Sequence, residues 1–200
     1  IIEGAALDDQ GEYRVIVTNG VGTTTSNNAE LIVMENEPPT AEIFEPIEGS
    51  TYVAGSNIRF SGIGTDPEDG DLPLEAYSWQ IDFHHDTHHH GQPPIEGVST
   101  GSFTVPDRGE TSPDVWYKVT LTVTDSKGLT GKDEIEIFPE KSIISLSTDP
   151  AGLEILIDGQ PFVTPVEIES VVGTRRTLSV NSPQIVDNVE FEFESWSNDG

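Results

Sequence analysis

The chain has 200 residues, 34% of them hydrophobic, and it contains no cysteine. The lack of cysteine excludes disulfides, thiolate-bound zinc, iron–sulfur clusters and thiol nucleophiles. No apolar run approaches the ~18 residues that a membrane-spanning helix needs. Thirty-six acidic residues against nine basic ones give a net charge of −27. A surface this negative repels phosphate backbones and anionic lipids. We therefore expect no nucleic-acid partner and no membrane insertion.

The pattern along the chain is typical of β-strands. Short runs of alternating β-branched and polar residues are separated by turn residues, and no dozen residues show a helical period. Nineteen glycines and fourteen prolines fit many tight turns. The sequence therefore predicts an all-β fold, with its clearest strands at residues 12–18, 115–124, 134–138 and 153–157.

Two proline-containing junctions divide the chain. Residues 35–40 include Pro38-Pro39, which hold an extended backbone, and residues 138–141 end a second series of strands. We therefore expect three pieces, at 1–37, 38–141 and 142–200. Acidic residues occur throughout all three, as in a solvated surface rather than a single acidic tail.

The first piece contains Asp9, Gly11 and Tyr13 ahead of a β-branched run. This arrangement resembles the E–F corner and strand F of an immunoglobulin-like domain, in which the tyrosine hydroxyl bonds back to the corner backbone. Residues 19–22 are expected to supply positive-φ positions of a hairpin, and 29–33 the last strand. Two strands bury too little surface to be stable alone, so we expect further strands upstream or a covering module.

The second piece resembles a PKD-type repeat. The resemblance is carried by an opening at 38–41, an early strand at 55–62, a tryptophan strand at 77–83 and a long strand with its turn at 116–128. It breaks off at residues 84–90, where the family has a Gly-Asp-Gly turn and this chain is rich in histidine. This histidine-rich stretch resembles insertions in PKD-like modules attached to bacterial secreted sugar dehydrogenases.

The third piece resembles a PEGA-type surface module. Residues 148–160 suggest a strand pair with a turn, and 164–165 and 173–178 continue the pattern. The chain stops at 195–200 without a closing strand. Together, the three resemblances imply tandem immunoglobulin-like β-sandwich modules, the terminal ones incomplete, within a larger extracellular protein.

All five histidines lie between positions 84 and 90. Neutral imidazoles bind transition metals, and an aspartate in the same stretch offers an oxygen ligand. If the segment is one extended strand, alternation places His84, Asp86 and His88 on one side and His85 and His89 on the other. The alternative is a solvated polar loop. The candidate transition-metal ligands are His84, His85, Asp86, His88, His89 and His90.

An acidic turn forms a second candidate cation site. Carboxylates on a glycine-containing turn are the hard oxygen ligands that calcium prefers. The turn is not an EF-hand loop, because Tyr77 occupies the position of the bidentate glutamate. A solvated acidic loop is the alternative. The candidate calcium ligands are Asp66, Glu68, Asp69 and Asp71.

The aromatic residues divide into core and surface candidates. Trp79 alternates with Ile81 and Phe83, which predicts a core position. Trp116 and Tyr117 are adjacent and so face opposite sides of a strand, and we take both as candidate ligand-binding residues. The stretch 97–101 has the spacing of a nucleophile elbow, but a strand follows it and no histidine occurs after His90, so we expect no catalytic residue there.

These observations favour a non-catalytic spacer, adhesion and interaction region of a bacterial surface or secreted protein. The alternative is a carbohydrate-binding accessory region of a secreted sugar dehydrogenase or polysaccharide-degrading enzyme. Metal-dependent activity at the histidines ranks last. The expected partners are neighbouring domains of the same chain, polysaccharide or surface proteins, and the expected cofactors are calcium and a transition metal.

Overall fold

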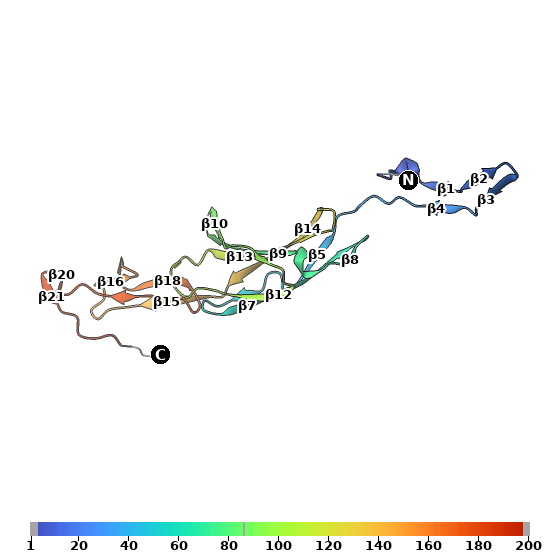
Figure 1. Ribbon diagram of the computed structural model, residues 1–200. Coiled ribbons are helices and arrows are strands. Elements are labelled where there is room, and N and C mark those ends of the chain that lie inside the picture. The colour runs from blue at the N-terminus through green and yellow to red at the C-terminus, as the bar shows by residue number, and fades with distance from the viewer. Residues whose placement is uncertain (1–3, 86, 198–200) are drawn as a thin grey trace.

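The computed structural model describes residues 4–85 and 87–197 and confirms an all-β fold. Its sheets form a first part (β1–β4), a central sandwich (β5–β14) and a third part (β15–β21). The parts follow one another along the length of the molecule, with β2 and β3 at one end and β20 and β21 at the other (Figure 1). Within the described residues, no helix has both the length and the apolar character that crossing a bilayer requires.

The first part is a narrow pair of ribbons that follows the 3-10 turn Leu7–Asp9. Tyr13 Oη donates a hydrogen bond of 2.7 Å to Asp9 O, the corner bond that the sequence predicts. The prediction of positive φ at Gly20 and Gly22 is wrong, since neither residue has it. The Asn19 side chain closes this turn instead, by accepting hydrogen bonds from the Val21 and Gly22 amides. The paired strands are β1 (Gly11–Tyr13) with β4 (Ala29–Leu31), and β2 (Ile16–Asn19) with β3 (Gly22–Thr25).

The central sandwich consists of two sheets. In the larger sheet the strands are antiparallel except for β6, which runs parallel to β14. Its members are β10 (His88–Gly91), β9 (Tyr77–His85), β13 (Val115–Thr124), β14 (Thr130–Pro139) and β6 (Thr51–Tyr52), with β11 (Ile95–Glu96) also on β9. The smaller sheet holds β12 (Thr100–Thr104), β7 (Asn57–Asp66), β5 (Thr40–Glu45) and β8 (Gly70–Asp71). The 3-10 turn Leu74–Ala76 leads into β9.

The core lies between these two sheets. Alternation along β9 and β13 points every second side chain inward, as expected for strands with one face buried. Trp79 is 0% exposed, which confirms its predicted core position, and its Nε1 donates to Val98 O at 2.9 Å. Its ring packs against Phe60 of the other sheet, with centroids 4.6 Å apart.

The third part has a smaller core around Ile155 and Ile157. The hairpin between β16 and β17 turns at Asp158 and Gly159, which both have positive φ, as a type I′ turn requires. Its strands are β15 (Lys141–Leu146) with β18 (Val166–Val171), β17 (Gln160–Val163) with β16 (Glu154–Ile157) and β19 (Leu178–Ser179), and β20 (Gln184–Val186) with β21 (Val189–Phe191).

Leu121 tests the packing of the central sandwich, because it is 0% exposed in β13. We expect Leu121→Ala to lower the free energy of unfolding by about 2–5 kcal/mol, through lost burial and the cavity left behind. Leu129, 41% exposed at the β13–β14 turn, is the matched control. Its alanine variant should cost less than about 1 kcal/mol. Urea unfolding measures both, and equal costs would contradict the packing described.

Candidate metal centre

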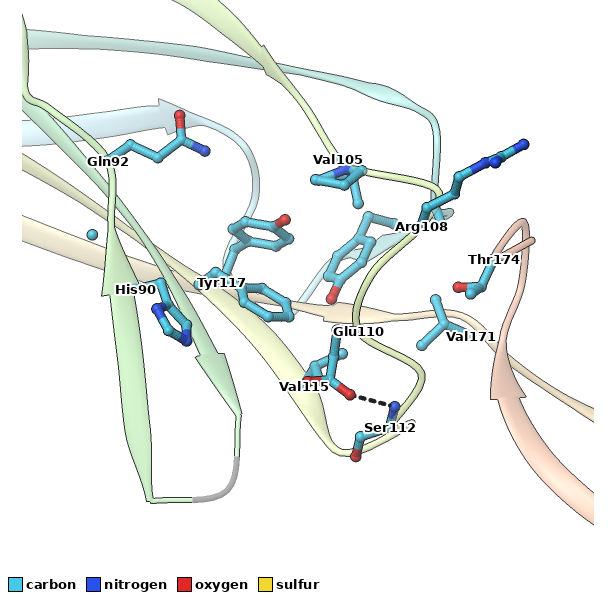
Figure 2. Close-up of a pocket in the computed structure, with 15 residues that line it drawn as sticks. His90, Gln92, Val105, Arg108, Glu110, Ser112, Val115, Tyr117, Val171 and Thr174 are labelled. Carbon is cyan, nitrogen blue, oxygen red and sulfur yellow. Dashed lines mark hydrogen bonds between the residues drawn. The ribbon is translucent and has the colours of Figure 1, made fainter. Parts of the chain in front are cut away.

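The β9–β10 hairpin gathers the histidines at the edge of the larger sheet, and Figure 2 shows His90 on this hairpin. His85 pairs with His88, His84 with His89, and Phe83 with His90. Directly paired residues of antiparallel strands share a face. His85, His88 and His90 therefore lie on one face, and His84 and His89 lie on the other.

This arrangement differs from the alternation expected for one extended strand, which places His84 and His88 together. The chain reverses between His85 and His88, so counting by twos does not continue from one strand into the next. Asp86, the predicted oxygen ligand, lies outside the described residues.

His85, His88 and His90, here called the three-histidine group, form the candidate metal site. One ring nitrogen from each lies within 4.8 Å of the others. The Nε2 atoms of His85 and His90 are 3.0 Å apart. Two imidazole nitrogens on a tetrahedral zinc ion, each at about 2.0–2.1 Å, are separated by about 3.3 Å. The group thus needs only small side-chain movements to hold a transition metal, and three protein ligands leave a fourth position open.

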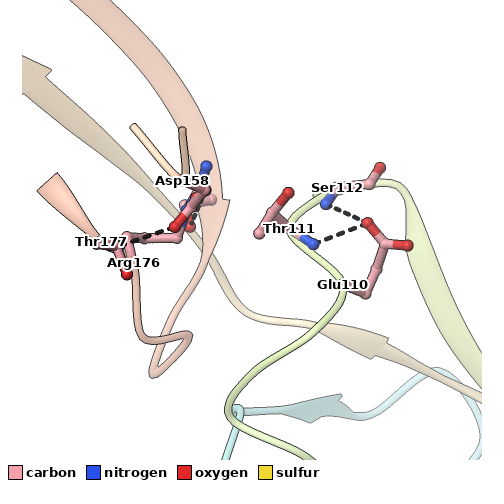
Figure 3. A network of polar contacts seen from close by, with 7 residues as sticks. Glu110, Thr111, Ser112, Asp158, Arg176 and Thr177 are labelled. Atoms are coloured by element: carbon pink, nitrogen blue, oxygen red, sulfur yellow. Dashed lines mark hydrogen bonds and ion pairs between the residues drawn. The ribbon is translucent and has the colours of Figure 1, made fainter. Parts of the chain in front are cut away.

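Glu110 orients this group from outside the hairpin. Its Oε2 lies 3.5 Å from His85 Nδ1, and its Oε1 accepts hydrogen bonds of 2.8 and 2.7 Å from the amides of Thr111 and Ser112 (Figure 3). A carboxylate near Nδ1 favours the ring orientation that turns Nε2 toward a metal. Sequence reasoning missed Glu110, because it reaches His85 across a loop and no local spacing links the two.

The other face of the hairpin carries an aromatic stack. The His84 ring lies between Trp116 and His89, with centroid distances of 4.9 and 5.1 Å. Burial, and then the neighbouring His89, lower the pKa of His84. Among the described residues, His84 Nε2 and Trp116 Nε1 are buried without a hydrogen-bond partner. This face suits a neutral ring packed against tryptophan, so the five predicted histidine ligands do not form one site.

The four acidic residues proposed for calcium lie on the hairpin between β7 and β8, with Asp66 and Asp71 in the strands and Glu68 and Asp69 in the turn. Asp66 Oδ1 accepts bonds from the amides of Glu68 and Asp69, and Asp69 accepts two from Ser126. Among the described residues, the three-histidine group is the one set of three or more His, Asp or Glu side chains whose ligand atoms all lie within 4.8 Å of one another. The carboxylates of Asp66, Glu68, Asp69 and Asp71 do not converge in this way, and calcium binding there stays a prediction.

Trp116 and Tyr117 point to opposite faces of β13, as their adjacency predicts. Trp116 is half-buried beneath His84. Tyr117 is buried and lines a pocket on the other face (Figure 2). Burial raises the pKa of the Tyr117 hydroxyl to about 12. The two residues therefore do not share one binding surface.

No protein-family model matches the chain, and no curated protein matches it in sequence. The resemblances to immunoglobulin-like, PKD-type and PEGA-type modules rest on the sequence motifs and stay predictions.

We expect tag-free protein to bind one zinc ion per chain, measured by isothermal titration calorimetry. His90→Ala should abolish saturable binding, because it removes one of three ligands. Glu110→Gln should weaken binding about 10- to 100-fold, the usual effect of losing a group that orients a ligand. Zinc should also raise the melting midpoint, because it binds only the folded hairpin.

His89→Ala is the matched control for this titration, since it removes a histidine from the opposite face of the same hairpin. Its zinc affinity should equal that of the unmodified chain. An equal loss in His89→Ala and His90→Ala would show that the metal does not select the face of the three-histidine group.

Proposed function

We propose that this chain is a non-catalytic spacer and interaction region of a larger exported bacterial protein, at the cell surface or outside the cell. The observation that supports the proposal best is the short, closely bonded connection between the central sandwich and the third part. A spacer keeps distance only when its joints resist bending, and a joint of this kind does so.

The backbone of the joint is a single residue long. β14 ends at Pro139 and β15 begins at Lys141, so only Glu140 lies between them. Both of its peptide groups are bonded: Glu140 N donates to Tyr52 O at 2.8 Å, and Glu140 O accepts from Val172 N at 2.8 Å. Ala54 N donates in turn to Val172 O at 2.8 Å. The first bond holds the connecting residue against β6, and the other two hold Val172, in the turn after β18, against the connecting residue and against Ala54 of the sandwich.

Side chains extend this joint on both sides. Val171 of the third part is only 8% exposed and belongs to the core cluster of the central sandwich. Lys141 Nζ lies 3.1 Å from both Glu169 Oε2 and Asp114 Oδ1, and Arg175 Nε lies 2.6 Å from Asp107 Oδ2. The bonds to Glu169 and then to Asp114 raise the pKa of Lys141. Exposed ion pairs contribute little individually, so the buried valine and the backbone bonds support most of the rigidity.

The linker at the other end of the sandwich is also held. Asn36 Nδ2 donates to Asp125 Oδ2 at 2.6 Å, and Glu37 N donates to Glu68 Oε2 at 3.1 Å. The next two residues are prolines, which limit the backbone further. Both ends of the central sandwich therefore favour a fixed direction for the chain.

Two further features favour a spacer over a catalytic or sugar-binding role. His88 and His90 of the three-histidine group are exposed to solvent, whereas metal catalysis needs a site that excludes water. Trp116 and Tyr117 point to opposite faces of β13, and His84 stacks on Trp116, so the two rings do not form one flat surface on which a sugar could stack. A metal at this edge fits a structural or interaction role.

Gly173 tests the joint. Its φ is +87°, and a Cβ there would lie 2.4 Å from Ala54 O and 2.8 Å from a Val53 methyl carbon. We expect Gly173→Ala to separate the two parts, because the turn cannot approach the sandwich with a methyl group in the way. In ¹⁵N relaxation measurements, the central sandwich and the third part should share one rotational correlation time in the unmodified chain and have two in the variant.

Gly159→Ala is the control for this experiment. Gly159 has a similar φ of +80° but no atom within 4 Å of its added Cβ, so it carries the backbone strain without the clash. This variant should tumble like the unmodified chain. Independent tumbling of the two parts in the unmodified chain would contradict the proposed rigid spacer.

A further inference from the structure

A pocket of about 210 Å³ lies where the central sandwich meets the third part. Aromatic side chains of the sandwich form its inner wall, while Val171 and Thr174 close it from the other side (Figure 2). His90 and Glu110 line its rim. Most of the lining residues belong to the sandwich, and the third part contributes Val171 and Thr174.

Tyr52 gives this pocket a specific polar group. The residue is 3% exposed and lines the pocket, yet its hydroxyl has no hydrogen-bond partner among the described residues. Its ring is fixed edge-on against Tyr117, with centroids 5.3 Å apart. Burial, and then the neighbouring Tyr117, raise the pKa of Tyr52, so the hydroxyl stays protonated and can donate. Buried hydroxyls are normally paired, so an acceptor from a ligand would satisfy this one.

Size and lining define the class of ligand. An apolar cavity of roughly 150 Å³ is large enough for benzene, so 210 Å³ accommodates one ring with a small substituent. Phe83 and Tyr117, 5.1 Å apart, offer the edges and faces that aromatic rings prefer. A sugar fits poorly, because each hydroxyl that it buries needs its own partner. Arg108 and Glu110 both line the pocket and carry opposite charges, so it is the net charge of −27 of the chain that disfavours an anionic ligand.

We infer that this pocket binds a small neutral aromatic compound whose carbonyl or phenol oxygen accepts a hydrogen bond from Tyr52 Oη. The ring packs against Phe83 and Tyr117, and the oxygen lies toward the sandwich. Because Val171 and Thr174 contribute to the same pocket, an occupied pocket adds contacts between the two parts of the chain.

Benzamide is a suitable probe, since it is neutral, has one ring and carries a carbonyl acceptor. Titration into the ¹⁵N-labelled chain with EDTA present, so that no metal contributes, should shift the amide signals around Tyr52, Tyr117 and Val171 in a saturable way. Tyr52→Phe should weaken this binding about 10-fold, the effect of one hydrogen bond. The melting midpoint of the ligand-free variant should stay the same or rise, because no bond within the protein is lost.

Tyr77→Phe is the matched control. Tyr77 is buried in the same sandwich, but its hydroxyl accepts a 2.7 Å bond from Gly64 N and does not line the pocket. This variant should melt lower and bind benzamide like the unmodified chain. Three results would overturn the inference: no saturable shifts at millimolar benzamide, binding of glucose in place of benzamide, or unchanged benzamide affinity in Tyr52→Phe.

Discussion

The pairing of β9 with β13 is the constraint on which the core, the candidate metal site and the pocket all depend. The two strands are in continuous antiparallel register from Tyr77 opposite Val123 to His85 opposite Val115. At one end of this ladder, Trp79 and Leu121 fill the space between the sheets. At the other end, the same alternation sends His85 to one face and His84 to the other. A shift of the register by one residue would bury polar side chains and exchange the faces of the histidines.

Four of the nine basic residues of this acidic chain form ion pairs that join elements of the fold. Lys118 bonds to Glu134 on the adjacent strand at 2.6 Å, and Arg176 pairs with Asp158 at the turn between β16 and β17. Lys141 and Arg175 pair with acids across the joint. With 36 acids and nine bases, most carboxylates are left without a cationic partner and repel one another. This repulsion favours an elongated arrangement, and the basic residues oppose it at particular contacts.

Features that depend on residues close together in the sequence were predictable, whereas features that depend on contacts between distant residues were not. The Trp79 core position was predictable from alternation, and the Tyr13 corner bond was implied by the resemblance to an immunoglobulin-like corner. The face on which His88 lies was not predictable, because the chain reverses just before it and a reversal changes which residues share a face. No glycine in the sequence marks this turn. Glu110 lies far along the chain from His85, and only the fold brings the two together. The burial of the Tyr52 hydroxyl without a hydrogen-bond partner likewise depends on the fold and has no signal in the sequence.

The loop at 105–114 connects the features that sequence reasoning treated separately. Glu110 reaches His85 of the metal site, whereas Asp107 and Asp114 pair with Arg175 and Lys141 of the third part. Glu110 also lines the pocket. The loop has no regular hydrogen-bonded structure of its own, so its position depends on these contacts at its two sides. The histidine hairpin, the pocket and the joint therefore all contact this one loop.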